Sequence, residues 1–233
     1  MAIDIGNGLA TETLPHFTQS AATVTRDPGN PRIIVSSDFP ITIAPDGALY
    51  YPWIRFGQQL QVIRLAPSGT TTVLTTLPAR TKSEPLRWLN GIAAAANGSI
   101  YFTENRAIKK ITPQGKLTTV ASNLTLSGCD SLPGVGAELG PYFRGLDVDA
   151  QGTVYVAATG CRAVLKITAD KEVSTVLRTS SPWSPTAVAV SSNGLYVLEY
   201  LHTASENRRD WLPRVRKVSP DGHVVTVATI DQR

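Results

Sequence analysis

Histidine, cysteine and methionine are scarce in this sequence: 233 residues contain three histidines, two cysteines and one methionine. The two cysteines, Cys129 and Cys161, belong to no Cys-x-x-Cys motif and to no Cys/His cluster, which argues against a structural zinc site. The sequence also lacks a serine nucleophile elbow, a glycine-rich phosphate loop and a His-Glu-x-x-His motif. The common signatures of serine hydrolases, nucleotide-binding proteins and zinc proteases are therefore missing.

Long apolar runs and dense charge are missing as well. No stretch approaches the roughly 20 apolar residues that span a bilayer, so we expect no membrane span. Charged residues make up 17% of the chain and the net charge is +4, with small basic clusters only at Lys109-Lys110 and Arg208-Arg209. Without a basic helix interleaved with aromatic residues, we expect no nucleic-acid partner. The N-terminal MAIDIGNGLATETLPHF has neither the charged nor the apolar region of a signal peptide.

Short strands separated by turn residues fill most of the chain. The stretch Asn90–Ser122 reads NGIAAAANGSIYFTENRAIKKITPQGKLTTVAS. It predicts four strands of about five or six residues, joined at Asn97-Gly98, Asn105-Arg106 and Pro113-Gln114-Gly115, which form an antiparallel meander. One such sheet cannot bury both of its faces, so we expect neighbouring sheets of the same kind.

The same layout occurs four times, at approximately residues 38–78, 88–122, 142–178 and 184–230. Each unit has a tight turn between its first two strands, at Asp46-Gly47, Asn97-Gly98, Gln151-Gly152 and Asn193-Gly194. A four-stranded unit that repeats every roughly 42 to 55 residues is typical of β-propeller blades. Residues 1–37 fit no complete unit, and we interpret them as an N-terminal arm or the remnant of a preceding blade.

The units NGIAAAANGSIYFTENRAIKKITPQGKLTTVA and TAVAVSSNGLYVLEY resemble NHL repeats. They are also similar to blades of the SMP-30/gluconolactonase-like and strictosidine-synthase-like six-bladed propellers. The resemblance, which runs from Asp38 to the C-terminus, implies an all-β fold: a β-propeller of four-stranded antiparallel blades, about four of them complete, after an irregular N-terminal segment. A truncated six-bladed propeller, an open arc, a four-bladed ring and an arc completed by another subunit remain open, and we favour a partial six-bladed type.

Propeller connectivity assigns each loop to one of two faces. The tight turns all fall on one face, here called the turn-rich face, and the long insertions at 78–89, 122–141, 178–184 and 201–213 fall on the opposite, loop-rich face. Long loops on a rigid scaffold commonly carry binding sites, so we expect the ligand site on the loop-rich face. Its candidate residues are Asn90, Glu104, Arg144, Glu199, His202, Glu206, Arg208 and Trp211.

The family resemblance also implies a metal. In the lactonases of this family a divalent cation lies over the channel, held by Asn, Asp and Glu at the starts of the inner strands. Calcium or magnesium is therefore the candidate cofactor, with Asn90 and Asp38 as candidate ligands. The equivalent positions of the other two blades hold Arg144 and Thr186, which are poor ligands, and Asn90 alternatively satisfies backbone groups of a turn or bulge.

The segment SIYFTENRAIKKITPQGK also resembles blades of the streptogramin lyases, which use His and Glu residues around magnesium. Their Glu-x-His pattern has no match here, and Glu199-Tyr200-Leu201-His202 comes nearest with a different spacing. His202 is either a general acid or base or a solvated loop histidine. The insertion that follows either binds a polar or anionic ligand through Arg208 and Trp211 or forms a charged loop with internal ion pairs.

Cys129 and Cys161 both fall on the loop-rich face. We expect a disulfide that ties down the Gly- and Ser-rich loop around Cys129, the alternative being two free, partly buried thiols. A disulfide implies an oxidising compartment, so we predict a periplasmic or extracellular protein.

Two functions of different classes follow from the sequence. The first is an NHL-type module that binds a protein or a small polar ligand on its loop-rich face, and the scarcity of titratable residues favours it. The second is a divergent metal-dependent lactonase or other hydrolase, or a streptogramin-lyase-like enzyme. The sequence leans toward a non-catalytic protein. Self-association through open blade edges is a third interpretation.

Overall fold

The computed structural model describes residues 2–4, 25–26, 32–34, 40–54, 59–78, 89–104, 106–126, 129, 142–201 and 212–229. These residues form four four-stranded antiparallel sheets, each with its strands in sequence order, and one three-stranded sheet. The predicted all-β architecture of antiparallel blades is confirmed. Among the described residues, no helix has the length and apolar character needed to cross a membrane.

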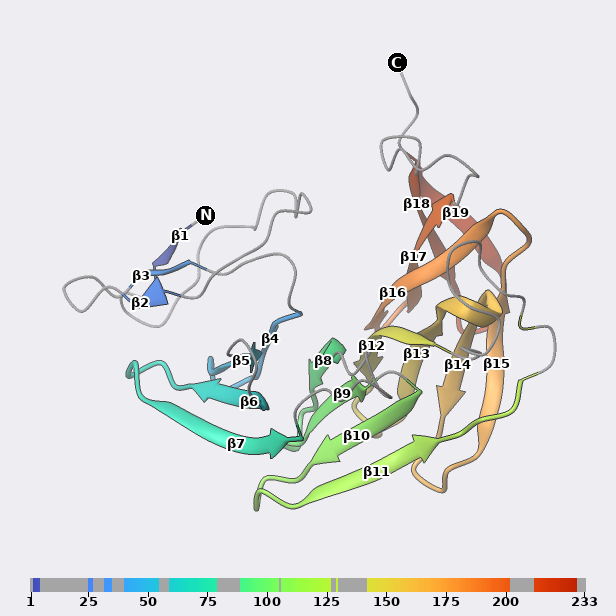
Figure 1. Cartoon of the computed structure of the whole chain (residues 1–233). Helices are drawn as coiled ribbons and strands as arrows, with labels where there is room; N and C mark the ends of the chain where they lie inside the picture. Colours follow the sequence, from blue (N-terminus) through green and yellow to red (C-terminus); the bar gives the residue numbers. More distant parts are fainter. Residues whose placement is uncertain are drawn as a thin grey trace.

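The four sheets are numbered as blades 1 to 4 along the chain (Figure 1). Blade 1 contains β4 (Thr42–Ile43), β5 (Leu49–Ile54), β6 (Leu60–Leu65) and β7 (Thr71–Leu77). Blade 2 contains β8 (Leu89–Ala94), β9 (Ile100–Glu104), β10 (Ala107–Ile111) and β11 (Leu117–Ser122). Blade 3 contains β12 (Phe143–Val148), β13 (Val154–Ala158), β14 (Ala163–Ile167) and β15 (Val173–Arg178), with the 3-10 turn η3 (Thr159–Cys161) after β13. Blade 4 contains β16 (Trp183–Ser191), β17 (Gly194–Leu201), β18 (Pro213–Val218) and β19 (Val224–Thr229).

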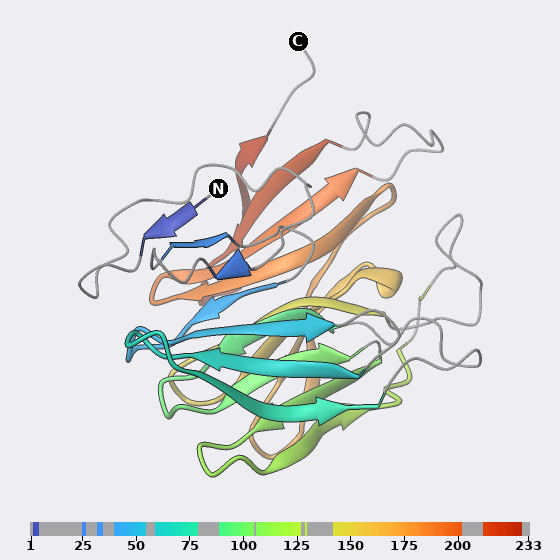
Figure 2. The ribbon, with the colours of Figure 1, turned by 60° about the vertical axis from the view of Figure 1, so that its left-hand side comes forward.

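The N-terminal sheet has the order β1-β3-β2, formed by β1 (Ala2–Asp4), β2 (Thr25–Arg26) and β3 (Arg32–Ile34). Figure 1 shows the four blades fanned around an arc, and Figure 2 shows the same sheets from the side of blade 1. The first strands of successive blades, β8, β12 and β16, contact one another, so they are the inner strands of the arc.

The tight turns that define the blades have the backbone geometry that their residues predict. Gly98 follows the Ala96-Asn97 turn at φ 78°, a left-handed conformation that glycine adopts without steric cost. The turn between the third and fourth strands has Gly115 in blade 2, at φ 80°. In blade 3 the same position is taken by Lys171, at φ 67°. The turn therefore keeps its shape where glycine is absent, at a cost in backbone strain for Lys171.

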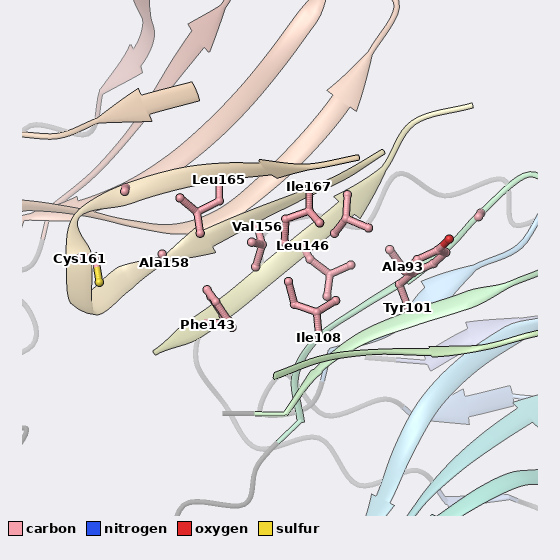
Figure 3. Packing of buried hydrophobic residues seen from close by; sticks show 13 residues of the cluster. Ala93, Tyr101, Ile108, Phe143, Leu146, Val156, Ala158, Cys161, Leu165 and Ile167 are labelled. Carbon is pink, nitrogen blue, oxygen red and sulfur yellow. The ribbon is translucent and has the colours of Figure 1, made fainter. Parts of the chain in front are cut away.

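Each blade packs against the next through apolar side chains on both sheets. Between blades 1 and 2, Tyr50 and Val62 pack with Ile92 and Phe102. Between blades 2 and 3, Tyr101 and Ile108 face Phe143, Leu146, Val156 and Leu165 (Figure 3). Between blades 3 and 4, Ala157 and Val164 pack with Val188 and Val197. The core is therefore divided into layers between blades, and each blade buries apolar side chains against its neighbour.

A tyrosine recurs at one position of the second strand in every blade, opposite a basic residue of the third strand. The pairs are Tyr50 with Arg64, Tyr101 with Lys110, Tyr155 with Lys166, and Tyr196 with Lys217. Arg64 Nε donates a hydrogen bond to the Tyr50 hydroxyl over 3.1 Å, and the Lys110 ammonium lies 5.2 Å from the centre of the Tyr101 ring. Because each pair lies just after the first turn of its blade, we regard it as part of the repeat and not of a ligand site.

The inner strands approach one another closely at two glycines. A Cβ added to Gly145 would lie 2.8 Å from Ala187 Cα and 3.0 Å from the Thr186 carbonyl oxygen. A Cβ added to Gly91 would lie 2.6 Å from the Arg144 carbonyl oxygen. Only glycine permits this separation between the inner strands.

Replacement of Gly145 by alanine is expected to destabilise the protein by about 1–3 kcal/mol, because the new methyl group must push the backbone of β16 away. Gly115→Asn is a suitable control, since Gly115 has open space around it at φ 80° and asparagine tolerates that conformation. Urea unfolding measures both changes. Equal loss of stability in the two variants would contradict the proposed packing constraint.

Candidate functional site

Three successive inner strands carry a β-bulge at the same place, near the loop-rich face. The bulge of β8 lies between Leu89 and Gly91 and contains Asn90. The bulge of β12 contains Arg144, and that of β16 contains Thr186. A bulged residue leaves the regular ladder and can be directed away from the sheet. The structure therefore places Asn90, Arg144 and Thr186 at equivalent positions of consecutive blades.

Two of these bulges each accept a hydrogen bond from a threonine hydroxyl of the preceding blade. Thr103 Oγ1, in blade 2, donates a hydrogen bond to the Arg144 carbonyl oxygen over 2.9 Å. Thr159 Oγ1, in blade 3, donates to the Pro185 carbonyl oxygen over 2.7 Å. Both threonines are buried. Since carbonyl groups freed by a bulge need donors, these hydroxyls fix the shape of the inner strands near the loop-rich face.

Asn90 has a specific partner in the next blade. The Tyr142 hydroxyl donates a hydrogen bond to Asn90 Oδ1 over 2.9 Å. The exposed guanidinium of Arg144 lies 5.9 Å from the centre of the Tyr142 ring. Glu104 is half-buried at the end of β9, paired with Leu89 at the start of β8. Asn90, Tyr142, Arg144 and Glu104 therefore lie at the same end of blades 2 and 3, and we call this group the mouth cluster.

The described residues do not fit the metal site that the family resemblance implies. They include no group of three His, Cys, Asp or Glu side chains able to hold a metal ion. The amide oxygen of Asn90 accepts a hydrogen bond from Tyr142, and the equivalent position in blade 3 carries the positive charge of Arg144. A guanidinium at this position repels a cation. Asp38, the second candidate ligand, lies outside the described residues.

Glu199 has a different environment from the other candidates on the loop-rich face. Its carboxylate is fully buried and accepts hydrogen bonds from Arg214 Nε over 2.6 Å and from Arg216 Nε and Nη2 over 3.0 and 2.7 Å. Arg214 also stacks on the Trp183 ring, with its guanidinium carbon 3.9 Å from the ring centre. The carboxylate of Glu199 is thus committed to an internal network beside the interface of blades 3 and 4.

Asp46 and Arg64, on the turn-rich face, form a contrasting surface pair. Arg64 Nη2 donates to Asp46 Oδ2 over 2.8 Å, and the Asp46 side chain is 53% exposed. The hydrogen bond from Arg64, with a further one from the Ala48 amide, lowers the pKa of Asp46 below its usual value. The Asp46–Arg64 pair therefore stabilises the protein at a pH above the pKa of Asp46 in the unfolded chain. This contribution is lost as the pH falls through the pKa of Asp46 in the folded protein. Solvent screening keeps that contribution small.

Cys129 and Cys161 form a disulfide, as predicted. Cys161 ends η3, is buried and belongs to the core between blades 2 and 3 (Figure 3). Cys129 lies in the insertion between blades 2 and 3 and packs against the same core. The disulfide thus attaches the insertion to blade 3 on the loop-rich face, and it is compatible with the predicted oxidising compartment.

Some predicted residues lie outside the described part of the chain, namely Asp38, His202, Glu206, Arg208 and Trp211. Sequence reasoning missed Arg214 and Arg216 as partners of Glu199, and Thr103 and Thr159 as donors to the bulges. The alternation Arg-Val-Arg at 214–216 indicates two arginines on one face of a strand, but its pairing with Glu199 depends on the strand register.

No family model matches the chain, and no curated protein matches it. Among solved structures it is similar to virginiamycin B lyase from Staphylococcus aureus, at 14% identity and a TM-score of 0.51, over 83% of this chain and 56% of the lyase. It is also similar to a luciferin-regenerating enzyme, at 14% identity and a TM-score of 0.53, over 92% of this chain and 73% of that one. The chain has a β-propeller fold.

A weaker likeness relates the propeller to regucalcin, a calcium-binding protein from Agrobacterium tumefaciens, at 18% identity and a TM-score of 0.49, over 72% of this chain and 55% of that one. At these identities the likeness shows the fold alone. The chain spans 56% of the length of the lyase, so the activity of a whole lyase does not transfer with the fold.

Replacement of Glu199 by glutamine is expected to cost about 3–5 kcal/mol of stability, because two partly buried guanidinium groups lose their carboxylate. The matched surface change, Asp46→Asn, is expected to cost less than about 1 kcal/mol. Denaturant unfolding of the two variants measures the difference. Similar losses would show that the Glu199 network is as weak as a surface ion pair.

Reduction of the Cys129–Cys161 disulfide, or its removal in a Cys129→Ser/Cys161→Ser variant, is expected to lower the free energy of unfolding. The bridge closes a loop with a sequence separation of 32, for which chain entropy gives about 3–4 kcal/mol. Thermal unfolding with and without reductant measures the effect, and the double-serine variant, which should not respond to reductant, is the control. An unchanged Tm in the wild type would contradict the prediction.

Proposed function

We propose that this propeller is an enzyme acting on a small polar molecule at its loop-rich channel mouth, of the lyase or hydrolase class, and that its substrate carries an anionic group. The observation that supports this most is the equivalent placement of Asn90, Arg144 and Thr186 in the bulges of three successive inner strands. Three polar side chains from rigid strands at one end of an arc form a preorganised recognition surface.

Arg144 is the proposed anion-binding residue. It is exposed, and its planar guanidinium suits a carboxylate or phosphate group through paired hydrogen bonds. Thr103 and Gly145 fix its backbone from opposite sides, through the hydrogen bond to its carbonyl group and the close contact with β16. The position of the guanidinium therefore depends on the packing of blades 2, 3 and 4.

Asn90 and Tyr142 are proposed to position the substrate, since their mutual hydrogen bond orients both polar groups. Glu104 is the carboxylate of the mouth cluster and the proposed proton-transfer group. No step is assigned to a metal, because the described residues do not fit one. In this proposal Arg144 supplies the charge stabilisation for the anionic group.

Of the two functions predicted from the sequence, the similar structures lend more support to an enzyme than to a pure binding module. Virginiamycin B lyase and the luciferin-regenerating enzyme share the fold over most of this chain. The binding module stays the second candidate, because Asn90, Tyr142, Arg144 and Thr186 are recognition residues and Glu104 is the one carboxylate of the mouth cluster. Turnover separates the two candidates.

Citrate and inorganic phosphate are suitable probes of the mouth. We expect citrate to raise the Tm of the wild type in a saturable way and to have little effect on Arg144→Gln, which loses the paired donors. Arg64→Gln, on the turn-rich face, is the matched control and should respond like the wild type. An equal response of Arg144→Gln and the wild type would contradict the assignment of Arg144.

Hydrolysis of 6-phosphogluconolactone, a small lactone that carries a phosphate group, is the activity assay, with and without millimolar calcium or magnesium, and neutral gluconolactone is the matched compound without the anionic group. Turnover that is lost in Glu104→Gln would support the enzyme, and saturable binding of citrate without turnover of either compound would favour the binding module. A saturable rise in Tm with either cation would contradict the conclusion that the described residues do not fit a metal.

A further inference from the structure

Two arginines of β18 share one buried carboxylate. Arg214 Nε donates to Glu199 Oε2, and Arg216 Nε and Nη2 donate to Glu199 Oε1. Because each carboxylate oxygen binds one guanidinium, the two guanidinium groups lie side by side. Among the described residues no second carboxylate pairs with either arginine, so one of the two positive charges is left uncompensated.

Most N–H groups of the two guanidiniums have no partner within the described part of the chain. A guanidinium has five N–H groups, of which Arg214 uses one and Arg216 uses two. The Arg214 and Arg216 side chains are only 18% and 16% exposed. Even so, the only fully buried side-chain nitrogen or oxygen without a partner among the described residues is Ser184 Oγ, so the unpaired Nη atoms of both arginines reach solvent.

The geometry of a guanidinium leaves one of its two hydrogen-bonding edges available in each arginine. The edge that carries Nε is directed to Glu199 in both residues. The edge between the two Nη atoms is the second fork, and it suits an oxyanion through paired hydrogen bonds. Glu199 therefore orients the two arginines and leaves this fork of each one to a further acceptor.

Trp183 holds the Arg214 guanidinium from one side. The guanidinium carbon lies 3.9 Å from the centre of the Trp183 ring, and stacking leaves the in-plane N–H groups available. The Trp183 backbone is itself fixed: its N–H donates to the Ser180 carbonyl oxygen over 3.0 Å, and its carbonyl oxygen accepts from Thr179 Oγ1 over 2.7 Å. The position of Arg214 is thus set by a carboxylate and an aromatic ring together, as in a preorganised binding site.

We propose that Arg214 and Arg216, oriented by Glu199 and Trp183, form a binding site for a phosphate group. The tetrahedral oxygens of a phosphate accept hydrogen bonds in several directions and can pair with both guanidiniums, whereas a carboxylate has two oxygens in one plane and matches a single fork. A phosphate monoester carries about −1.5 to −2 charges at neutral pH, which compensates the excess positive charge of the pair.

This site is separate from the mouth cluster. Arg214 and Arg216 belong to the third strand of blade 4, and β17 lies between that strand and the inner strand β16. Two strand spacings place β18 roughly 10 Å from β16. The inference therefore does not rest on the proposed enzyme function or on anion binding by Arg144.

Nitrogen-15 NMR of the arginine Nε–Hε groups tests the proposal. The protein used is Arg144→Gln, in which the arginine of the mouth cluster is absent, titrated with inorganic phosphate at constant ionic strength. We expect the Arg214 and Arg216 signals to shift in a saturable way, and acetate to bind about tenfold more weakly. No saturable shift up to about 50 mM phosphate, which fills a millimolar site, would overturn the proposal. An equal response to acetate and phosphate would also overturn it.

A double variant tests the two forks directly. In the Arg144→Gln background, Arg214→Lys/Arg216→Lys keeps both positive charges beside Glu199 but removes the planar forks, and we expect the Kd for phosphate to rise at least about tenfold. The matched control is Arg64→Lys, which makes the same change in the arginine paired with Asp46 and should leave the Kd unchanged. An unchanged Kd in a folded double-lysine variant would contradict the site.

The outcomes for this site and for the mouth cluster can be told apart. Phosphate binding by the wild type that disappears in Arg144→Gln alone would overturn the Arg214/Arg216 site and leave the mouth cluster as the anion site. Glycerol 3-phosphate, titrated in the same way, distinguishes the two sources of the phosphate group: tighter binding than inorganic phosphate identifies a monoester as the ligand, and weaker binding identifies free phosphate.

Discussion

The close contact between successive inner strands is the constraint on which the rest of the structure depends. Gly91 lies against Arg144, and Gly145 lies against Thr186 and Ala187, at separations that no Cβ allows. At both contacts the inner strand of the following blade carries a β-bulge. A buried threonine of the preceding blade donates a hydrogen bond to a backbone carbonyl group at that bulge. The same bulges carry the polar residues of the channel mouth, so blade packing and site geometry have one physical origin.

The sequence predicts the blades well because their signals are local. The Asn97-Gly98 and Pro113–Gly115 turns specify strand ends within a few residues, and the Cys129–Cys161 disulfide follows from placing both cysteines on one face. The equivalence of Asn90 and Arg144 also follows from aligned repeats. The partners of Glu199 could not be predicted in this way, because they depend on a register set across the 202–211 insertion.

Glu199 shows how that missing information changes a functional interpretation. In the sequence it resembles Glu104, since each lies near the end of the second strand of its blade, toward the loop-rich face. In the structure Glu199 is enclosed by two arginines, whereas Glu104 is half-buried beside the bulge of Asn90. A carboxylate held by three charge-assisted hydrogen bonds is a poor ligand for a substrate or a cation, because its lone pairs are occupied and its charge is compensated.

The same reasoning distinguishes core from surface in the outer strands. Val176 and Val227 occupy the same bulge of the same repeat, and their sequence surroundings do not predict that one packs in a core while the other is half exposed. The difference arises from whether another sheet packs on that face among the described residues. In a repeat protein each unit provides half of two interfaces, so equivalent positions of two blades can have the same apolar composition and different exposure. Blade 4 has kept its valines, and its face therefore retains the chemistry of a contact between blades.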